Sequence, residues 1–154
     1  MPAYFFDTSA LVKRYVNETG SAWVDDPTDL ATGNDIYILR MTEIEVTSAV
    51  TRRRRGGTLS VTDAATVLAQ FRQDLANEYH VVEVTPVILA AAVSLVETHG
   101  LRAYDAIQLA AVSALNAYRI TLSLSDLTLV SADQELNAAA ATDGLTVEDP
   151  NAHP

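Results

Sequence analysis

The sequence contains no cysteine, which excludes disulfide bonds, thiolate metal sites and cysteine nucleophiles. Glycine and proline are scarce, with six and five among 154 residues, and apolar residues make up 49% of the chain. Such a composition is typical of a globular protein with its own hydrophobic core. No apolar run approaches the roughly 18 residues of a membrane span, and no cationic segment leads into a signal-peptide-like stretch. We therefore expect a soluble, cytoplasmic protein without a membrane partner.

Basic residues are also few: ten Lys and Arg stand against twenty Asp and Glu, so the net charge is −10. This charge opposes nucleic-acid binding, because affinity for phosphates comes largely from cations. Four of the basic residues nevertheless form one run, Arg52–Arg55, followed by two glycines. Two interpretations stay open. The run either compensates the dipole at the end of a helix, or it forms a local basic edge on an acidic protein.

Segments with strand and helix patterns alternate along the chain, and no repeat or linker divides it. Short β-branched and aromatic runs predict strands at 3–7, 35–40, 81–85, 127–133 and 145–149. Apolar residues at helical spacing predict helices at 10–18, 20–30, 41–55, 60–79, 86–99, 101–119 and 134–142. Thr8 and Ser9 are expected to cap the first helix. The pattern predicts a single α/β domain over residues 1–154, with a parallel sheet between layers of helices.

Two acidic residues follow strands of this predicted sheet: Asp7 ends the first strand, and Asp133 follows the apolar run of the fourth. In open parallel sheets, ligands bind outside the carboxyl ends of the strands. Asp133 also suits the N-cap of the next helix. We expect both carboxylates at the functional edge of the sheet.

Helical geometry selects two further acids. With Met41 set at 0° and about 100° per residue, the apolar arc of the helix at 41–55 is centred near about 60°. Glu45 falls inside this arc at about 40°, whereas Glu43 falls at about 200° on the polar side. Asp105 shares an inward-facing stripe of the helix predicted at 101–119. An acid in the first turn of a helix also suits the helix dipole. His99 is interpreted as a helix-end residue, because no other histidine accompanies it.

Four carboxylates at one edge repel each other unless they are protonated or share cations. With no cysteine and no histidine cluster, an all-oxygen site indicates hard divalent ions, Mg²⁺ or Mn²⁺. Ions held by carboxylates suit in-line hydrolysis of phosphodiesters by an activated water.

Four ordered blocks now resemble a known family: FDTSALVKRY at 6–15, EVTSAVTRR at 45–53, LRAYDAIQLAA at 101–111, and LVSADQEL followed by GLTVEDP. They are similar to PIN-domain ribonucleases, and among these to the VapC-type toxins of bacterial toxin–antitoxin pairs. The resemblance covers nearly the whole chain. It implies a three-layer α/β/α fold whose central parallel sheet has roughly four to five strands. It also implies a homodimer, an RNA substrate and a cognate VapB-like antitoxin that blocks the active site.

The resemblance carries metal-binding and catalytic roles onto Asp7, Glu45, Asp105 and Asp133. Thr8 and Ser131 match hydroxyl positions beside these acids that could orient a ligand or a water. The third block has Tyr104 and Gln108 where many members have other residues, which bears on substrate preference.

The sequence therefore predicts a Mg²⁺- or Mn²⁺-dependent endoribonuclease, the toxin of such a pair. Arg52, at about 20°, is the member of the arginine run most nearly aligned with Glu45 and is expected to bind RNA phosphates. A housekeeping RNA-processing nuclease and a non-catalytic PIN-like binding module stay open as alternatives. Receiver domains and haloacid-dehalogenase-like phosphatases fit poorly, since position 9 is Ser and no Lys follows Lys13.

Overall fold

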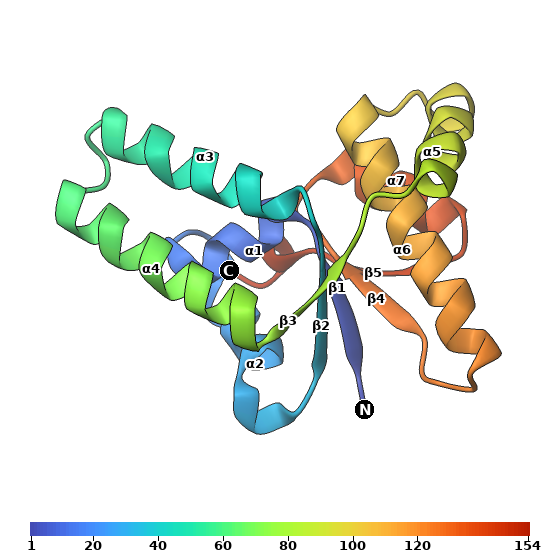
Figure 1. The fold of residues 1–154 in the computed structure, drawn as a ribbon, viewed down its shortest axis with the longest axis horizontal. Helices are drawn as coiled ribbons and strands as arrows, with labels where there is room; N and C mark the ends of the chain where they lie inside the picture. The colour runs from blue at the N-terminus through green and yellow to red at the C-terminus, as the bar shows by residue number, and fades with distance from the viewer.

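Five parallel strands form the centre of the computed structural model, which describes residues 1–154 (Figure 1). In chain order they are β1 (Ala3–Phe6), β2 (Asp35–Leu39), β3 (Tyr79–Val82), β4 (Leu127–Val130) and β5 (Thr146–Glu148). The spatial order is β3-β2-β1-β4-β5. β1 lies in the middle, and Phe6 at its carboxyl end pairs with Ile38 of β2 and Val130 of β4. The strand order therefore reverses direction at β1, where a ligand crevice is expected.

Helices cover both faces of the sheet (Figure 1). One face carries α1 (Thr8–Tyr15), α2 (Ser21–Thr28), α3 (Thr42–Arg55) and α4 (Val61–Asn77). The other carries α5 (Pro86–His99), α6 (Ala103–Thr121) and α7 (Gln134–Thr142). Two short 3₁₀ turns, Leu30–Thr32 and Pro150–Ala152, complete the chain. The three-layer α/β/α architecture predicted from the sequence is confirmed. No helix combines the length and the apolar character that crossing a membrane requires.

The continuous apolar strands fill two cores, one on each side of the sheet. Phe5 of β1 is buried among α5, α6 and α7, whereas Phe6 is buried in the core beneath α1 to α4. Successive side chains of a strand point to opposite faces, so adjacent phenylalanines serve different cores. Truncating either to alanine would cost about 3–5 kcal/mol. This packing fixes the end of β1, and with it the residue that follows.

The first helix begins earlier than predicted, and its cap differs. Asp7, not Thr8 or Ser9, is the N-cap, with extended backbone angles and a carboxylate that accepts from the Ser9 amide at 3.4 Å. The helix ends at Tyr15 because Val16 adopts an extended conformation. β3 also begins two residues before the expected position, at Tyr79, which pairs with Ile36. The capping role places the Asp7 carboxylate at the junction of strand and helix.

Candidate active site

A cavity of about 290 Å³ opens at the carboxyl edge of the sheet, and all four acids predicted from the sequence line it. They come from four separate segments: the β1–α1 junction, α3, α6 and the residue before α7. Figure 1 shows α3 and α6 both starting near the carboxyl edge of the sheet, on opposite faces. The complete lining consists of Asp7, Thr8, Ser9, Glu45, Arg102, Tyr104, Asp105 and Asp133.

Asp7 is the most deeply placed of the four acids, with only 4% of its surface exposed. Its Oδ2 accepts hydrogen bonds from Ser9 Oγ at 2.6 Å and Ser131 Oγ at 3.3 Å. Burial raises the pKa of Asp7, and the Ser9 and Ser131 hydrogen bonds oppose that rise. Ser131 also accepts from the Asp133 amide at 3.0 Å. One hydroxyl therefore links two of the acids, at the position that the sequence indicated.

Ser9 contributes to the site in a way the sequence analysis missed. Besides donating to Asp7, its Oγ accepts from the Ala132 amide at 3.0 Å and lies 3.4 Å from Ser131 Oγ. It ties the end of β1 to the loop after β4. A local signal was available, because a serine two residues after an aspartate commonly bonds that carboxylate.

Glu45 lies in α3, whose buried residues are Thr42, Val46 and Val50. With Met41 at 0°, these residues lie between about 100° and 180°, so the expected buried arc centred near about 60° is wrong. Ile44, counted in that arc, is 70% exposed. The reason is that α3 packs mainly on α1, α4 and β2, which fixes its buried face independently of where apolar residues occur. Glu45 is therefore half-buried on the flank of that face, where it borders the cavity. Glu43 does not border the cavity.

Two hydroxyls lie near the Glu45 carboxylate. Burial raises the pKa of Glu45, the hydroxyls of Thr8 and Tyr104 lower it, and the charge of Asp7 raises it further. The buried Thr8 Oγ1 has no hydrogen-bond partner within the protein. Tyr104 accepts from Gln108 Nε2 at 3.3 Å, and burial together with the Glu45 charge raises the pKa of its phenol. Tyr104 is therefore a neutral hydrogen-bonding group near neutral pH.

Asp105 shows most directly that the acids act on one another. Burial, and after it the charges of Asp133, Asp7 and Glu45, raise its pKa to about 6, and Arg102 opposes this rise. Asp133 caps α7 by accepting from the Leu136 amide at 2.9 Å. Asp133 is therefore both the expected N-cap of α7 and part of the cavity lining.

The arginine run of α3 divides into members with different surroundings. Arg52 lines a shallow depression together with Thr8 and Glu45, which also belong to the acidic cavity. Arg53 forms an ion pair with Glu18. Arg54 lies at a separate depression between α3 and α4. Only Arg52 therefore extends the acidic cavity along α3, as the alignment with Glu45 indicated.

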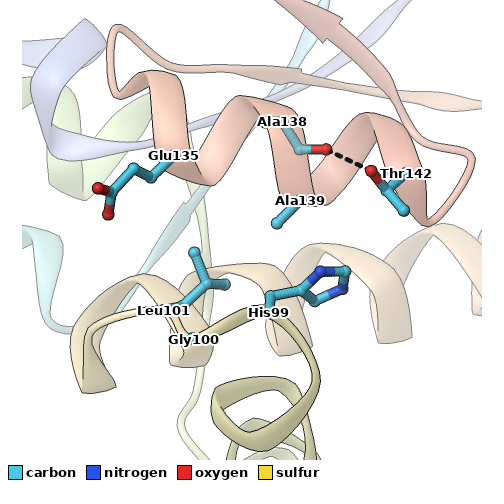
Figure 2. Close-up of a pocket in the computed structure, with 7 residues that line it drawn as sticks. All are labelled: His99, Gly100, Leu101, Glu135, Ala138, Ala139 and Thr142. Carbon is cyan, nitrogen blue, oxygen red and sulfur yellow. Dashed lines mark hydrogen bonds between the residues drawn. The ribbon is translucent and has the colours of Figure 1, made fainter.

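A larger cavity of about 390 Å³ lies elsewhere, between the α5–α6 turn and α7 (Figure 2). Its lining holds a single carboxylate, Glu135, and Figure 2 shows the His99 ring beside alanine and leucine side chains. His99 pairs with Asp143 at 3.0 Å. It is the last residue of α5, and Gly100, which has a left-handed backbone, follows it as the C-cap. The interpretation of His99 as a helix-end residue is confirmed. The lining of this cavity offers no group of side chains that together could bind a metal or catalyse a reaction.

The donor set of the acidic cavity suits a hard divalent cation. All candidate ligands are carboxylate or hydroxyl oxygens, the type that Mg²⁺ and Mn²⁺ prefer. No three carboxylates lie close enough together to form a ready-made coordination cage. Mg²⁺ does not require one, because it keeps several waters and commonly uses one or two carboxylates plus substrate phosphates. Burial raises the pKa values of Asp7, Glu45 and Asp105, and neighbouring carboxylates add to the rise for Glu45 and Asp105. A bound cation would oppose both effects, because it favours the charged forms.

Comparison with known structures identifies proteins with the same fold. PAE2754 from Pyrobaculum aerophilum is 23% identical, with a TM-score of 0.63 over 98% of this chain and 85% of its own. FitAcB from Neisseria gonorrhoeae is 18% identical, with a TM-score of 0.63 over 96% of this chain and 97% of its own. VapBC2 from Rickettsia felis, bound to a DNA fragment from its promoter, is 16% identical, with a TM-score of 0.59 over 96% and 98%.

No curated protein sequence is similar enough to this chain to count as a match. The family model of the PIN domain, in contrast, matches residues 4–141. This range includes the four cavity acids, the strands β2, β3 and β4, and all of β1 except Ala3. The chain belongs to the PIN domain family.

Proposed function

We propose that this protein is a Mg²⁺- or Mn²⁺-dependent endoribonuclease and the toxin of a toxin–antitoxin pair. The observation that carries the proposal is the meeting of four carboxylates, from four separate segments, in one cavity at the reversal point of a parallel sheet. Such an arrangement costs stability, since burial raises the pKa values of Asp7, Glu45 and Asp105 and neighbouring charges add to the rise for the last two. A site that costs stability is typically retained for function.

Electrostatics supports a cation requirement independently of the family. A phosphodiester carries negative charge, and this chain presents a negatively charged cavity on a protein of net charge −10. The substrate is repelled unless the carboxylates are neutralised. Divalent cations held by Asp7, Glu45, Asp105 and Asp133 would relieve that repulsion, activate a water and stabilise the leaving oxygen.

The remaining residues of the site have binding and orienting roles in this proposal. Ser9 and Ser131 hold the Asp7 carboxylate through their hydrogen bonds. Thr8 and Tyr104 border Glu45, and the unpartnered Thr8 hydroxyl is available to orient a water or ligand. Arg52 lies seven residues after Glu45, about 10 Å along the helix axis. That separation suits a phosphate beside the scissile bond rather than the reacting one.

The toxin role and a VapB-like antitoxin are supported by the structural relatives, and the proposal includes a homodimeric assembly. VapBC2 and FitAcB share the architecture over nearly their whole length, and another relative is described as a toxin–antitoxin complex from Klebsiella pneumoniae. Induced expression of the wild-type chain in a bacterial host should arrest growth. Asp7→Asn, which keeps a good N-cap, should not. Equal growth under both would contradict the toxin role while leaving nuclease activity open.

The nuclease activity is tested with purified, partner-free protein and mixed RNA. We expect cleavage with Mg²⁺ or Mn²⁺ and none with EDTA, and we expect products with 5′-phosphate and 3′-hydroxyl ends. A 2′,3′-cyclic phosphate would instead indicate attack by the ribose. Cleavage that continues in EDTA, or that Asp7→Asn retains in full, would overturn the proposal.

A further inference from the structure

Arg102 is the one cation in the lining of the acidic cavity. It is the N-cap residue of α6, with an extended backbone, but its exposed side chain makes no capping hydrogen bond. It takes part in none of the ion pairs of the protein, unlike Arg14, Arg40, Arg53 and Arg119. A guanidinium beside several carboxylates that pairs with none of them is free to bind another anion.

The position of Arg102 relative to Arg52 suggests which anion. Arg52 lines the depression along α3, whereas Arg102 lines the part of the cavity near Asp105, and Thr8 and Glu45 belong to both. The two hollows therefore adjoin at Thr8 and Glu45, and each is lined by one arginine that forms no ion pair. Figure 1 shows α3 leading away from the sheet edge on one side and α6 starting on the other.

This spacing matches a charged polymer better than a small ligand. A nucleic-acid strand carries one phosphate per nucleotide, so a strand that crosses the acids presents phosphates on both sides of the bond there. The planar guanidinium binds a phosphate through two parallel hydrogen bonds. Two arginines on opposite sides would therefore hold the strand across the carboxylates without touching the reacting phosphate.

We propose that Arg102 binds the RNA phosphate that adjoins the scissile bond on the side opposite Arg52. This inference rests on the proposed ribonuclease function and adds to it a second phosphate subsite and a path for the strand. Arg102 acts in binding and not in chemistry.

The test uses the full chain and a short single-stranded oligoribonucleotide with one cleavage site. One phosphate at a time is replaced by a neutral methylphosphonate, with 2′-O-methyl protection of the preceding sugar. For the wild type, neutralising one phosphate on each side of the scissile bond should raise KM about tenfold, the effect of one lost charge-assisted contact.

Arg102→Gln should raise KM about tenfold on the unmodified RNA, leave kcat largely unchanged and lose sensitivity to one of these two phosphates. Arg52→Gln should lose sensitivity to the other. Arg72→Gln is the matched control: it removes the same charge from an exposed residue of α4 that borders neither acidic hollow, and it should keep the wild-type pattern. Thermal unfolding checks that each variant folds.

A separate binding measurement distinguishes failure of this inference from failure of the nuclease proposal. Anisotropy with a fully 2′-O-methylated oligonucleotide in Mn²⁺, whose length is checked on a gel after each reading, makes the same comparison by binding alone. Arg102→Gln should weaken binding and reduce the salt slope by about one. The role of Arg102 is overturned, even if the wild type cleaves RNA, by either of two results. One is that Arg102→Gln keeps the wild-type sensitivity to each neutralised phosphate and the wild-type salt slope; the other is that only kcat changes.

Discussion

Replacing Asp105 by Asn should stabilise the metal-free protein at neutral pH and leave it unchanged in acid. The side chain of Asp105 makes no hydrogen bond that asparagine would lose, and its surroundings are the charges of Asp133, Asp7 and Glu45. These charges and its burial raise its pKa from 3.8 to about 6. The folded protein therefore holds the Asp105 proton more tightly than the unfolded chain does.

An acid with a raised pKa in the folded state supports folding at low pH and loses that contribution as the pH rises. For Asp105 the contribution is complete below about pH 4 and lost as the pH passes about 6. If fully felt, the change would correspond to about 3 kcal/mol. Because the side chain is only partly buried, solvent screening reduces the effect, and we expect about 1 kcal/mol. For a domain of this size that corresponds to about 2–4 °C in Tm.

Thermal unfolding followed by circular dichroism in EDTA, below about pH 4 and above about pH 7, measures the effect. Asp105→Asn should unfold at the wild-type temperature in acid and about 2–4 °C higher at neutral pH. Asp126→Asn removes the same charge from an exposed loop outside the cavity and should unfold with the wild type at both pH values. An equal shift of Asp105→Asn at both pH values, or a lower Tm at neutral pH, would refute the claim that the carboxylates repel one another.

Two further substitutions test the geometry of the site. Glu45→Gln should abolish RNA cleavage, whereas Glu43→Gln, the same change two residues away and outside the cavity, should leave rate and stability nearly unchanged; comparable losses in both would show that the wrong face of α3 was assigned. Ser9→Ala removes the donor to Asp7 and the acceptor of the Ala132 amide. It should lower the free energy of unfolding by about 1–3 kcal/mol and reduce kcat, and denaturant unfolding with wild-type stability would contradict the role of that hydroxyl.

The fold could be predicted from the sequence because its strands are short, continuous apolar runs. The adjacent apolar residues Phe5 and Phe6 are both fully buried, on opposite faces of β1, and a continuous apolar run is the signature of a strand covered on both sides. Placing Asp7 and Asp133 at the same edge followed from the rule that ligands bind beyond the carboxyl ends of parallel strands.

The buried face of α3 could not be read from periodicity alone. Ile44 is apolar yet exposed, because the elements packed on a helix determine which side is covered. Glu45 still reaches the cavity, but from the flank of the buried face rather than its centre. Hydrophobic periodicity indicates that a helix is amphipathic more reliably than it locates a polar residue at the border of the core.

The sequence analysis related Tyr104 to substrate preference, but it could not place Arg102 or Tyr104 in the cavity, for a different reason. Nothing in their immediate neighbourhood requires an arginine or a tyrosine, and their place in the cavity depends on where the start of α6 meets α3 and β1. Such convergence of distant segments is a property of the tertiary fold. The Ser9 hydrogen bond, by contrast, is local and carried a sequence signal.

Binding of Mn²⁺, measured by isothermal titration calorimetry, tests the central claim that the four acids form a divalent-cation site. The wild type should bind Mn²⁺ saturably at neutral pH, and Asp126→Asn should bind equally well. Asp7→Asn, which keeps the helix cap but removes the buried charge, should bind at least tenfold more weakly, the loss expected for one charged ligand. No binding by the wild type, or equal binding by Asp7→Asn, would contradict the assignment of the cavity as a metal site.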